Sequence, residues 1–381
     1  MEPEAPRRQP FEVMIMTPGG LEHGGGIGRI VENMVEAWPE QPKMSVFDTR
    51  GPGHIIFSPL YFARCLAAIA LAAHRRPLLH INVAGRGSSI RKLIIVHFAR
   101  LLRLPIVLHL HDANYRRALQ QYPKLIRLAV ISMFKRSQRV VVLGAADRDL
   151  VVTVLGVEPY RVEVVPNAVP CPARHCTTSS RGDRPHILFL GSLSRRKGVH
   201  DLIRALATEP LRTLDWRITL AGGGAHEATF KNQVNELGLR DRIFFPGWVD
   251  RSVTAAFLQS ADIFVLPSYD EAMALSILEA MSYGLCVVCT PVGSHTEVIE
   301  DGISGILVLP GDVNKLADAL ATCVSDLALR VRLGTGARQV FEQKFDVSRY
   351  PDRMKLIYEA ASEWRPRGRN RSHIAPADRG A

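Results

Sequence analysis

The sequence predicts an α/β protein built from two halves, each a doubly wound parallel sheet with helices on both faces. Short apolar runs alternate with helix-forming segments along most of the 381 residues, which is typical of parallel strands joined by crossover helices. The alternation stops at a Pro- and Ser/Thr-rich stretch, 168–185, and then starts again. Because the chain is also too long for one ordinary core, we expect an N-terminal domain over 1–167, a linker over 168–185 and a C-terminal domain over 186–345.

In the first half, a strand predicted at 11–16 enters a Gly-rich loop, and a helix is expected over 27–38. The loop contains Gly25 and Gly26, whose backbone amides could approach an anion at the start of that helix. The loop lacks the GxGxxG spacing, so a nicotinamide dinucleotide is not indicated. The apolar segment at 55–73 contains Ser, Pro and Arg, and we expect it to be a buried helix rather than a membrane span.

Two further strands are predicted at 78–83 and 106–110, and the second ends in a His-Leu-His-Asp sequence. Strand alternation places His109 and His111 on the same face, at the carboxyl edge where such sheets bind ligands. This position favours a functional role for His111. The alternative is an ordinary strand-end histidine that is hydrogen-bonded to backbone. The first half then continues with a helix from 122, a strand at 139–143 and an apolar run that ends in a turn at Pro166-Asn167.

The second half opens with a strand at 186–190 and a basic loop, GSLSRRKG, before a helix at 199–207. Arg195, Arg196 and Lys197 lie in this glycine-bounded loop, where their charges would suit a diphosphate. A solvated basic loop is the alternative. Further strands are predicted at 216–221, 243–246 and 306–309. They are followed by two helices, a final helix at 348–364 and a basic tail, 366–381, that we expect to be disordered.

The strongest strand–helix–strand pattern lies in 266–290, LPSYDEAMALSILEAMSYGLCVVCT. An apolar run reaches Pro267, helix formers occupy 274–281, and a second apolar run covers 285–289. Glu271 lies in the loop before the helix and Glu279 within the helix. A helix start at the carboxyl edge of a strand suits a diphosphate, while the two carboxylates could accept hydrogen bonds from sugar hydroxyls. Alternatively both glutamates are simply solvated, since such pairs are common on exposed helices.

The net charge of +11 is concentrated in the first half, where Asp112 is the only acidic residue between Thr49 and Ala146. This excess of basic over acidic residues predicts an anionic partner. The segment at 91–103, which mixes basic and apolar residues, could lie on an anionic membrane surface or pack on the sheet. Nucleic acid is not expected, because no helix-turn-helix, zinc-finger or aromatic stacking signature is present. The polar start of the chain does not look like a signal peptide. We expect a cytoplasmic protein with reduced thiols and no metal site.

Several of these motifs together resemble the family 4 retaining glycosyltransferases, which have the GT-B fold of two Rossmann-like domains facing a central cleft. The resemblance covers nearly the whole chain. It rests on the glutamate pair, the loop 191–199, the Pro-Asn hinge at 166–169 and the stretch from Pro291 to Asp312. It implies that a C-terminal helix at about 346–365 crosses back onto the N-terminal domain. It also implies a nucleotide-diphosphate sugar as donor, with no cofactor and no metal.

The resemblance implies a role for each matched residue. Glu279 would hold the ribose hydroxyls, Glu271 and His111 would contact the transferred sugar, and Arg196 with Lys197 would neutralise the diphosphate. The other implied donor-binding positions are Gly25, Gly26, Ser192, Arg195, Val249 beside Trp248, Ala274, Leu275, Ser276 and Glu297.

This chain departs from the family pattern in three places. Ser192 stands where the family often has a phosphate-binding Arg, so Arg195 or Arg196 must substitute. Ala272 and Ala274 replace a frequent Gly and Pro, and Ser294-His295 occupies a place of smaller residues.

We therefore expect a retaining glycosyltransferase that moves a hexose to a lipid-linked or polysaccharide acceptor in cell-envelope or exopolysaccharide biosynthesis, peripheral on the inner membrane face. Two alternatives remain: a GT-B enzyme with a soluble acceptor, and a catalytically silent scaffold that binds sugar nucleotides.

Overall fold

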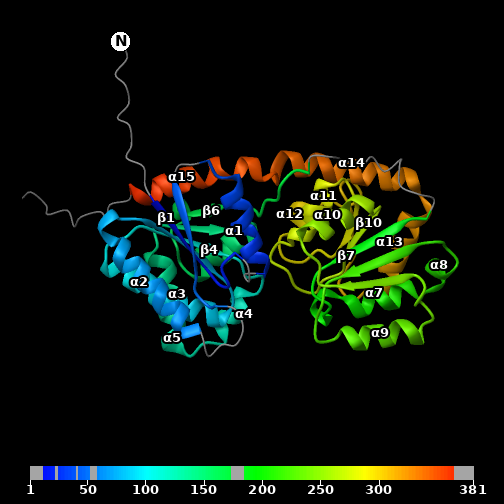
Figure 1. Cartoon of the computed structure of the whole chain (residues 1–381), viewed down its shortest axis with the longest axis horizontal. Coiled ribbons are helices and arrows are strands. Elements are labelled where there is room, and N and C mark those ends of the chain that lie inside the picture. The colour runs from blue at the N-terminus through cyan, green and yellow to red at the C-terminus, as the bar shows by residue number, and fades with distance from the viewer. Residues whose placement is uncertain (1–11, 22–24, 40–41, 52–57, 173–183, 364–381) are drawn as a thin grey trace, which may run out of the picture.

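The computed structural model describes residues 12–21, 25–39, 42–51, 58–172 and 184–363 (Figure 1). The polar start of the chain, the expected disordered tail at 366–381 and most of the expected linker lie outside these described residues. The described part contains two parallel six-stranded sheets, each belonging to a different half of the chain.

All neighbouring strands of the first sheet run parallel. The strands in spatial order are β2 (Lys43–Asp48), β1 (Glu12–Thr17), β3 (Leu78–Val83), β4 (Ile106–Leu110), β5 (Arg139–Val142) and β6 (Val162–Val164). Strands β3 and β4 are buried along their whole length, because helices cover both faces of the sheet. The order reverses between β1 and β3, which is where a doubly wound sheet opens a crevice for ligands.

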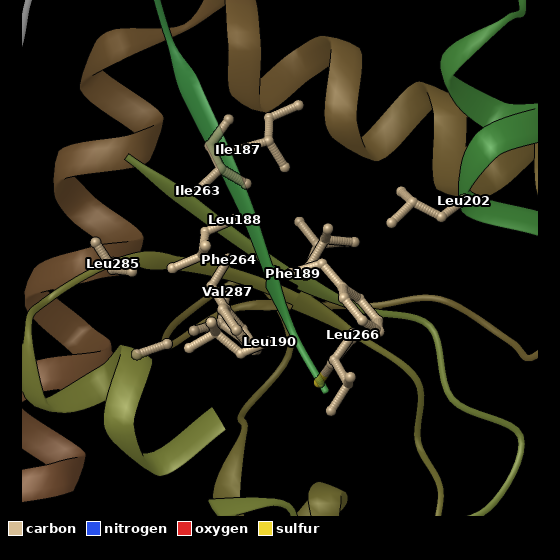
Figure 2. Packing of buried hydrophobic residues seen from close by; sticks show 14 of the residues in the cluster. Ile187, Leu188, Phe189, Leu190, Leu202, Ile263, Phe264, Leu266, Leu285 and Val287 are labelled. Carbon is tan, nitrogen blue, oxygen red and sulfur yellow. The ribbon is translucent and has the colours of Figure 1, made fainter. Parts of the chain in front are cut away.

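The second sheet repeats this arrangement. Its order is β12 (Ile306–Leu307), β11 (Cys286–Cys289), β10 (Ile263–Leu266), β7 (His186–Leu190), β8 (Arg217–Ala221) and β9 (Ile243–Gly247). Figure 2 shows apolar side chains of β7 and β10, among them Ile187, Phe189 and Phe264, packed together in its core. The predicted α/β class with two doubly wound parallel sheets is thus confirmed.

Helices cover both sheets (Figure 1). Those of the first half are α1 (Gly25–Ala37), α2 (Ser58–Ala72), α3 (Arg86–Leu101), α4 (Tyr115–Gln120), α5 (Lys124–Arg136) and α6 (Ala145–Asp149). Those that follow are α7 (Val199–Leu206), α8 (Glu209–Arg212), α9 (Glu227–Glu236), α10 (Arg251–Ser260), α11 (Leu275–Ser282), α12 (His295–Val298), α13 (Val313–Ser325), α14 (Leu327–Lys344) and α15 (Tyr350–Ser362).

Helix α2 corrects one sequence expectation. The segment predicted as a buried helix at 55–73 forms α2, but only four of its residues are buried, and Leu60 and Leu71 are exposed. It is therefore a covering helix whose outer face meets solvent, although its composition is mostly apolar. None of the helices in the described part of the chain has the length and apolar character needed to span a membrane.

The end of the chain returns to the first half. Helix α14 packs against α11 and β11 of the second half and runs back across the molecule, as Figure 1 shows. Helix α15 then contacts α1, β3, β4 and β5. Its residues Met354, Ile357 and Tyr358 are buried in one cluster with Val13 and Leu78. Part of the core of the first half therefore comes from the last helix.

Candidate active site

A cleft of about 1080 Å³ is lined by residues of both halves. The first half contributes the start of α1 and the loops that follow β3 and β4. The second half contributes the loops that follow β7 and β10 and the first turns of α11. Both sheets therefore present the carboxyl ends of their strands to one space, which is where open parallel sheets bind ligands.

The loop after β7 brings Lys197 into this cleft. Gly198 has a φ of 71°, and a Cβ at this position would collide with the carbonyl oxygen of Pro267, so only glycine fits there. The Lys197 ammonium forms an ion pair with the Glu271 carboxylate, and their side chains are only 12% and 10% exposed. The two charges are shielded from water. An ion pair in such an environment is stronger than one at an exposed surface.

The Glu271 carboxylate is also held by a second cation and a hydroxyl. Arg196 Nη1 lies 3.4 Å from Glu271 Oε1 and donates a hydrogen bond to the Asp270 carbonyl oxygen at 2.6 Å. Ser268 Oγ donates to the same Glu271 oxygen at 3.1 Å. A Cβ at Gly293 would collide with the Glu271 carbonyl oxygen, so a glycine is needed behind this loop. The loop thus presents one carboxylate and two cations at fixed places.

His295, one of the departures from the family pattern, lies beneath this loop and is fully buried. Its Nδ1 is hydrogen-bonded to the Thr290 carbonyl oxygen at 2.9 Å. Burial lowers the pKa of His295, against the smaller opposing influence of that bond and of Glu271. His295 therefore supports the loop that carries Glu271 as a neutral side chain.

Glu279 faces the cleft from α11 and is paired across it. Arg29 Nη2 on α1 lies 3.2 Å from Glu279 Oε1, so the two halves are joined by this ion pair. Burial raises the pKa of Glu279, whereas the charges of Arg29 and Arg251 lower it. No local pattern singles out Arg29, because its partner is 250 residues away.

Ala274, Leu275 and Ser276 line the cleft at the start of α11. Ala274 is the N-cap residue and makes no side-chain cap hydrogen bond. The unpaired amides of a first helical turn, together with the helix dipole, favour an anion at such a place. Lys197 and Arg196 line the same cleft, so the residues present could neutralise a diphosphate.

His111 lines the cleft from the first half, is half-buried, and ends a row of three imidazoles that begins with the buried His80 and His109. Its Nε2 is hydrogen-bonded to Asn82 Oδ1 at 2.8 Å, and its ring centroid lies 3.9 Å from that of His109. His109 Nδ1 meets His80 Nε2 at 3.2 Å, and His80 Nδ1 meets the Tyr358 hydroxyl of α15 at 2.6 Å. Burial lowers the pKa of His80 and of His111 to about 3. The imidazole at the cleft is therefore neutral and fixed in orientation.

The structure brings most of the predicted residues together. Those that line the cleft are Gly25, Gly26, His111, Ser192, Arg196, Lys197, Trp248, Val249, Glu271, Ala274, Leu275, Ser276 and Glu279. Arg195 is exposed and does not line it. Glu297 accepts a hydrogen bond from Ala145 N at 2.9 Å, at the start of α6 in the other half, and lies outside the lining as well. Donor-binding roles for Arg195 and Glu297 stay predictions.

Asn167 is a contributor whose role sequence reasoning did not specify. Its Nδ2 donates to the Met273 carbonyl oxygen at 3.0 Å, so the Pro-Asn turn at the end of the first half is bonded to the Glu271 loop. The signal was present in the sequence as the Pro-Asn hinge, but the partner could not be read from it.

The CxxC cysteines Cys286 and Cys289 are both buried in β11. Cys286 Sγ lies 3.4 Å from Cys323 Sγ on α13, and burial raises the pKa of Cys289. Within the described ranges, no cluster of three or more His, Cys, Asp or Glu residues could hold a metal ion. These thiols pack in the core of the second half.

Comparisons with known proteins agree with this arrangement. Residues 177–340 match the family Glycosyl transferases group 1, and residues 42–168 match the Glycosyl transferase 4-like domain. The two matches together span more than half of the chain.

Among curated relatives, the chain is 24% identical to an alpha-D-kanosaminyltransferase of Streptomyces kanamyceticus, over 94% of this chain and 97% of that protein. It is 33% identical to the lipopolysaccharide core biosynthesis glycosyltransferase LpsE of Rhizobium meliloti, over 43% of this chain and 46% of LpsE.

Two solved structures share the fold. The Anabaena protein HepE, in complex with UDP and glucose, has a TM-score of 0.73 at 19% identity, over 92% of this chain and 99% of that chain. Sucrose-phosphate synthase from Thermosynechococcus elongatus has a TM-score of 0.76 at 21% identity, over 92% and 98%.

Proposed function

Because the chain belongs to the glycosyltransferases with the GT-B fold and a 4-like N-terminal domain, we propose that it moves a hexose from a nucleotide-diphosphate sugar to an acceptor hydroxyl with retention at the anomeric carbon. One observation carries this proposal: the buried Lys197–Glu271 pair lies beside Arg196 and the start of α11 in one cleft. This set offers cations and amides to a diphosphate and a carboxylate to a sugar.

In the proposed reaction, the bond between the anomeric carbon and the diphosphate oxygen breaks while the acceptor oxygen bonds to that carbon from the same face. The acceptor proton passes to the departing diphosphate oxygen. Lys197, Arg196 and the α11 amides stabilise the negative charge that develops on this leaving group. No metal is required for that neutralisation, since these groups supply the positive charge. Gly25 and Gly26 admit the diphosphate at α1, and Ser192 lies near it as a neutral donor.

The remaining donor contacts follow from the cleft lining. Glu279 accepts hydrogen bonds from the ribose hydroxyls, and the base lies by Val249 and Trp248. Glu271 holds hydroxyls of the sugar, while His111 contacts the sugar from the opposite wall near its anomeric carbon.

Calorimetric titration tests the donor site most directly. UDP, GDP and ADP are titrated into the wild type, Lys197→Ala and Glu279→Ala, with Lys231→Ala as a control because Lys231 pairs with Glu227 on the exposed face of α9. We expect one nucleotide to bind selectively, more weakly in both cleft variants and unchanged in the control. Absence of binding to every nucleotide by the folded wild type would instead favour the silent scaffold.

We further propose that the acceptor is lipid-linked or a polysaccharide of the cell envelope, and that the enzyme works on the inner face of the cytoplasmic membrane. Helices α3 and α5 pack against each other and expose apolar side chains at Ile94 and Leu101 on α3 and at Leu125 and Leu128 on α5. Exposed basic residues lie on these helices or in the chain between them: Arg100, Arg103, Arg116, Arg117 and Lys124. Apolar side chains among basic ones suit an anionic bilayer surface.

Co-sedimentation with vesicles of anionic phospholipid tests this face. We expect binding that falls steeply as salt is raised, because the charges are exposed and are screened by salt. Leu101→Asp with Leu125→Asp should weaken it about 10-fold. Leu309→Asp, which alters an exposed leucine of the second half, should leave it unchanged. Failure of the wild type to bind these vesicles would favour a soluble acceptor.

A further inference from the structure

Arg29 occupies an unusual position between the two halves of the cleft. It lies on α1, one helical turn after Gly25, and both residues line the cleft. Its Nη2 contacts Glu279 Oε1 at 3.2 Å, and the two side chains are 29% and 18% exposed. Arg29 Nε is buried and has no hydrogen-bond partner among the residues that the structure describes. The guanidinium therefore uses only part of its donor capacity in the free protein.

The partner of Arg29 is the carboxylate that the proposed function assigns to the ribose. A ribose diol that binds a carboxylate with two hydroxyls approaches both oxygens, and one of these, Oε1, already accepts from Arg29. A ribose diol that occupies the edge of the carboxylate reached by Arg29 displaces the guanidinium from it. The displaced guanidinium must find another partner, because an unpaired charge in a largely buried place is costly.

The nucleotide whose ribose binds Glu279 also carries a diphosphate, which can be the new partner of the Arg29 guanidinium. The cleft-lining cations of the described chain are Arg29, Arg196 and Lys197. Arg196 and Lys197 both pair with Glu271 on the second half, and Arg195 is exposed outside the lining. Arg29 is thus the cation that comes from the first half, near the glycines at the start of α1, and a guanidinium binds phosphate oxygens through two parallel donors.

Resting on the proposed function, we propose that Arg29 exchanges partners when the donor binds. In the free protein it occupies Glu279. When the ribose takes that carboxylate, the guanidinium binds the diphosphate, so α1 of the first half holds a nucleotide that is seated on the second half.

This exchange has opposite consequences for two ligands. A nucleoside carries the ribose without the diphosphate. It must displace Arg29 from Glu279, and it has no phosphate to which the displaced guanidinium could bind. A nucleoside diphosphate also displaces Arg29 but regains its charge at the phosphates. Removing Arg29 should therefore help the first ligand and harm the second.

The experiment compares Arg29→Gln with Arg251→Gln by calorimetry. Arg251 is the matched control, because it also joins the halves through an ion pair with α1, to Glu36 at 2.9 Å, and its charge also acts on Glu279, yet it does not line the cleft. Each protein is titrated with the nucleoside diphosphate that the wild type binds among UDP, GDP and ADP, and with the corresponding nucleoside.

For Arg29→Gln we expect the diphosphate to bind about 10-fold more weakly and the nucleoside to bind equally well or several-fold more tightly. Arg29→Lys, which keeps the charge, should recover part of the diphosphate affinity. Arg251→Gln should change both affinities less than about 2-fold. Equal weakening of both ligands in Arg29→Gln, or unchanged diphosphate binding, would overturn the exchange while leaving the proposed function standing. A wild type that binds no nucleotide would overturn both.

Discussion

The two walls of the cleft differ in their electrostatics. On the wall from the second half, Lys197 and Arg196 both form ion pairs with Glu271. The wall from the first half presents Arg29, the carboxylates of Glu32 and Asp112, and the half-buried imidazole of His111, whose pKa is lowered to about 3. A diphosphate leaving group gains negative charge as it departs, whereas an acceptor hydroxyl and a sugar are neutral. Under the proposed mechanism, this difference predicts that donor and acceptor chemistry are divided between the halves.

The largest effect is expected from the wall of the second half. Lys197→Ala should lower kcat/KM for transfer by about 10³-fold, because removing one preorganised group that stabilises a developing charge costs 10²–10³-fold or more. The measurement is steady-state transfer from the sugar nucleotide that the enzyme uses. Lys231→Ala on α9 serves as the control. A folded Lys197→Ala enzyme within about tenfold of wild type would remove Lys197 from the mechanism.

The imidazole on the wall from the first half should give a smaller effect of a different kind. His111→Asn should lower kcat about 10–100-fold and change the affinity for the nucleoside diphosphate less than about 3-fold, since the proposed site places His111 at the sugar rather than at the nucleotide. Turnover and calorimetric binding of the same variant measure the two quantities. If nucleotide affinity fell as much as turnover, the division between the walls would be wrong.

Acid should destabilise the fold through the neutral histidines His80 and His111. His80 and His111 have a folded-state pKa of about 3, against about 6.5 when unfolded. Below pH 6.5 the unfolded chain binds protons that the folded chain does not, so the free energy of unfolding falls with falling pH. Each imidazole contributes a slope of up to about 1.4 kcal/mol per pH unit.

Urea unfolding at pH 7, 6 and 5 measures this slope. His80→Leu should flatten it, whereas His226→Leu, which changes an exposed histidine before α9, should not. Identical slopes in His80→Leu and the wild type would mean that His80 is not a source of the acid sensitivity.

The smallest effect is expected where the histidine stack meets the last helix. Tyr358→Phe removes the hydroxyl that contacts His80 at 2.6 Å and should lower the free energy of unfolding by about 1–2 kcal/mol, because it leaves a buried polar atom without that partner. Denaturant unfolding at pH 7 measures it.

Tyr350→Phe is its matched control on the same helix. The Tyr350 hydroxyl is buried and has no hydrogen-bond partner within the part of the chain that the structure describes. Its removal should therefore be neutral or stabilising. A loss as large as that of Tyr358→Phe would show that the bond to His80 is not what stabilises the helix.

Much of the fold could be predicted because its strands are locally distinct. Runs such as 78–83 and 106–110 are mostly apolar, and their predicted bounds match β3 and β4. Strand β2 was not predicted, since its sequence KMSVFD has neither a continuous apolar run nor strict alternation. It lies at the edge of the sheet, where pairing with β1 determines the strand.

The residues of the candidate site likewise fall into those that local sequence motifs predicted and those that they did not. Residues that belong to one local motif, such as Lys197 and Glu279, were found from the sequence and line the cleft. Arg29 was missed and Glu297 was placed differently, because their partners Glu279 and Ala145 lie in the opposite half. Contacts between distant segments depend on how the two sheets are arranged, which no local pattern specifies.

The return of α15 to the first half has a consequence for the order in which the protein is made. The buried faces of Val13, Ile15 and Leu78 are completed by Met354 and Tyr358, which are synthesised more than 270 residues after Leu78. A ribosome releases the second half in full before these residues emerge. The second sheet can therefore form on the nascent chain, while one apolar face of the first sheet stays uncovered until α15 has been synthesised.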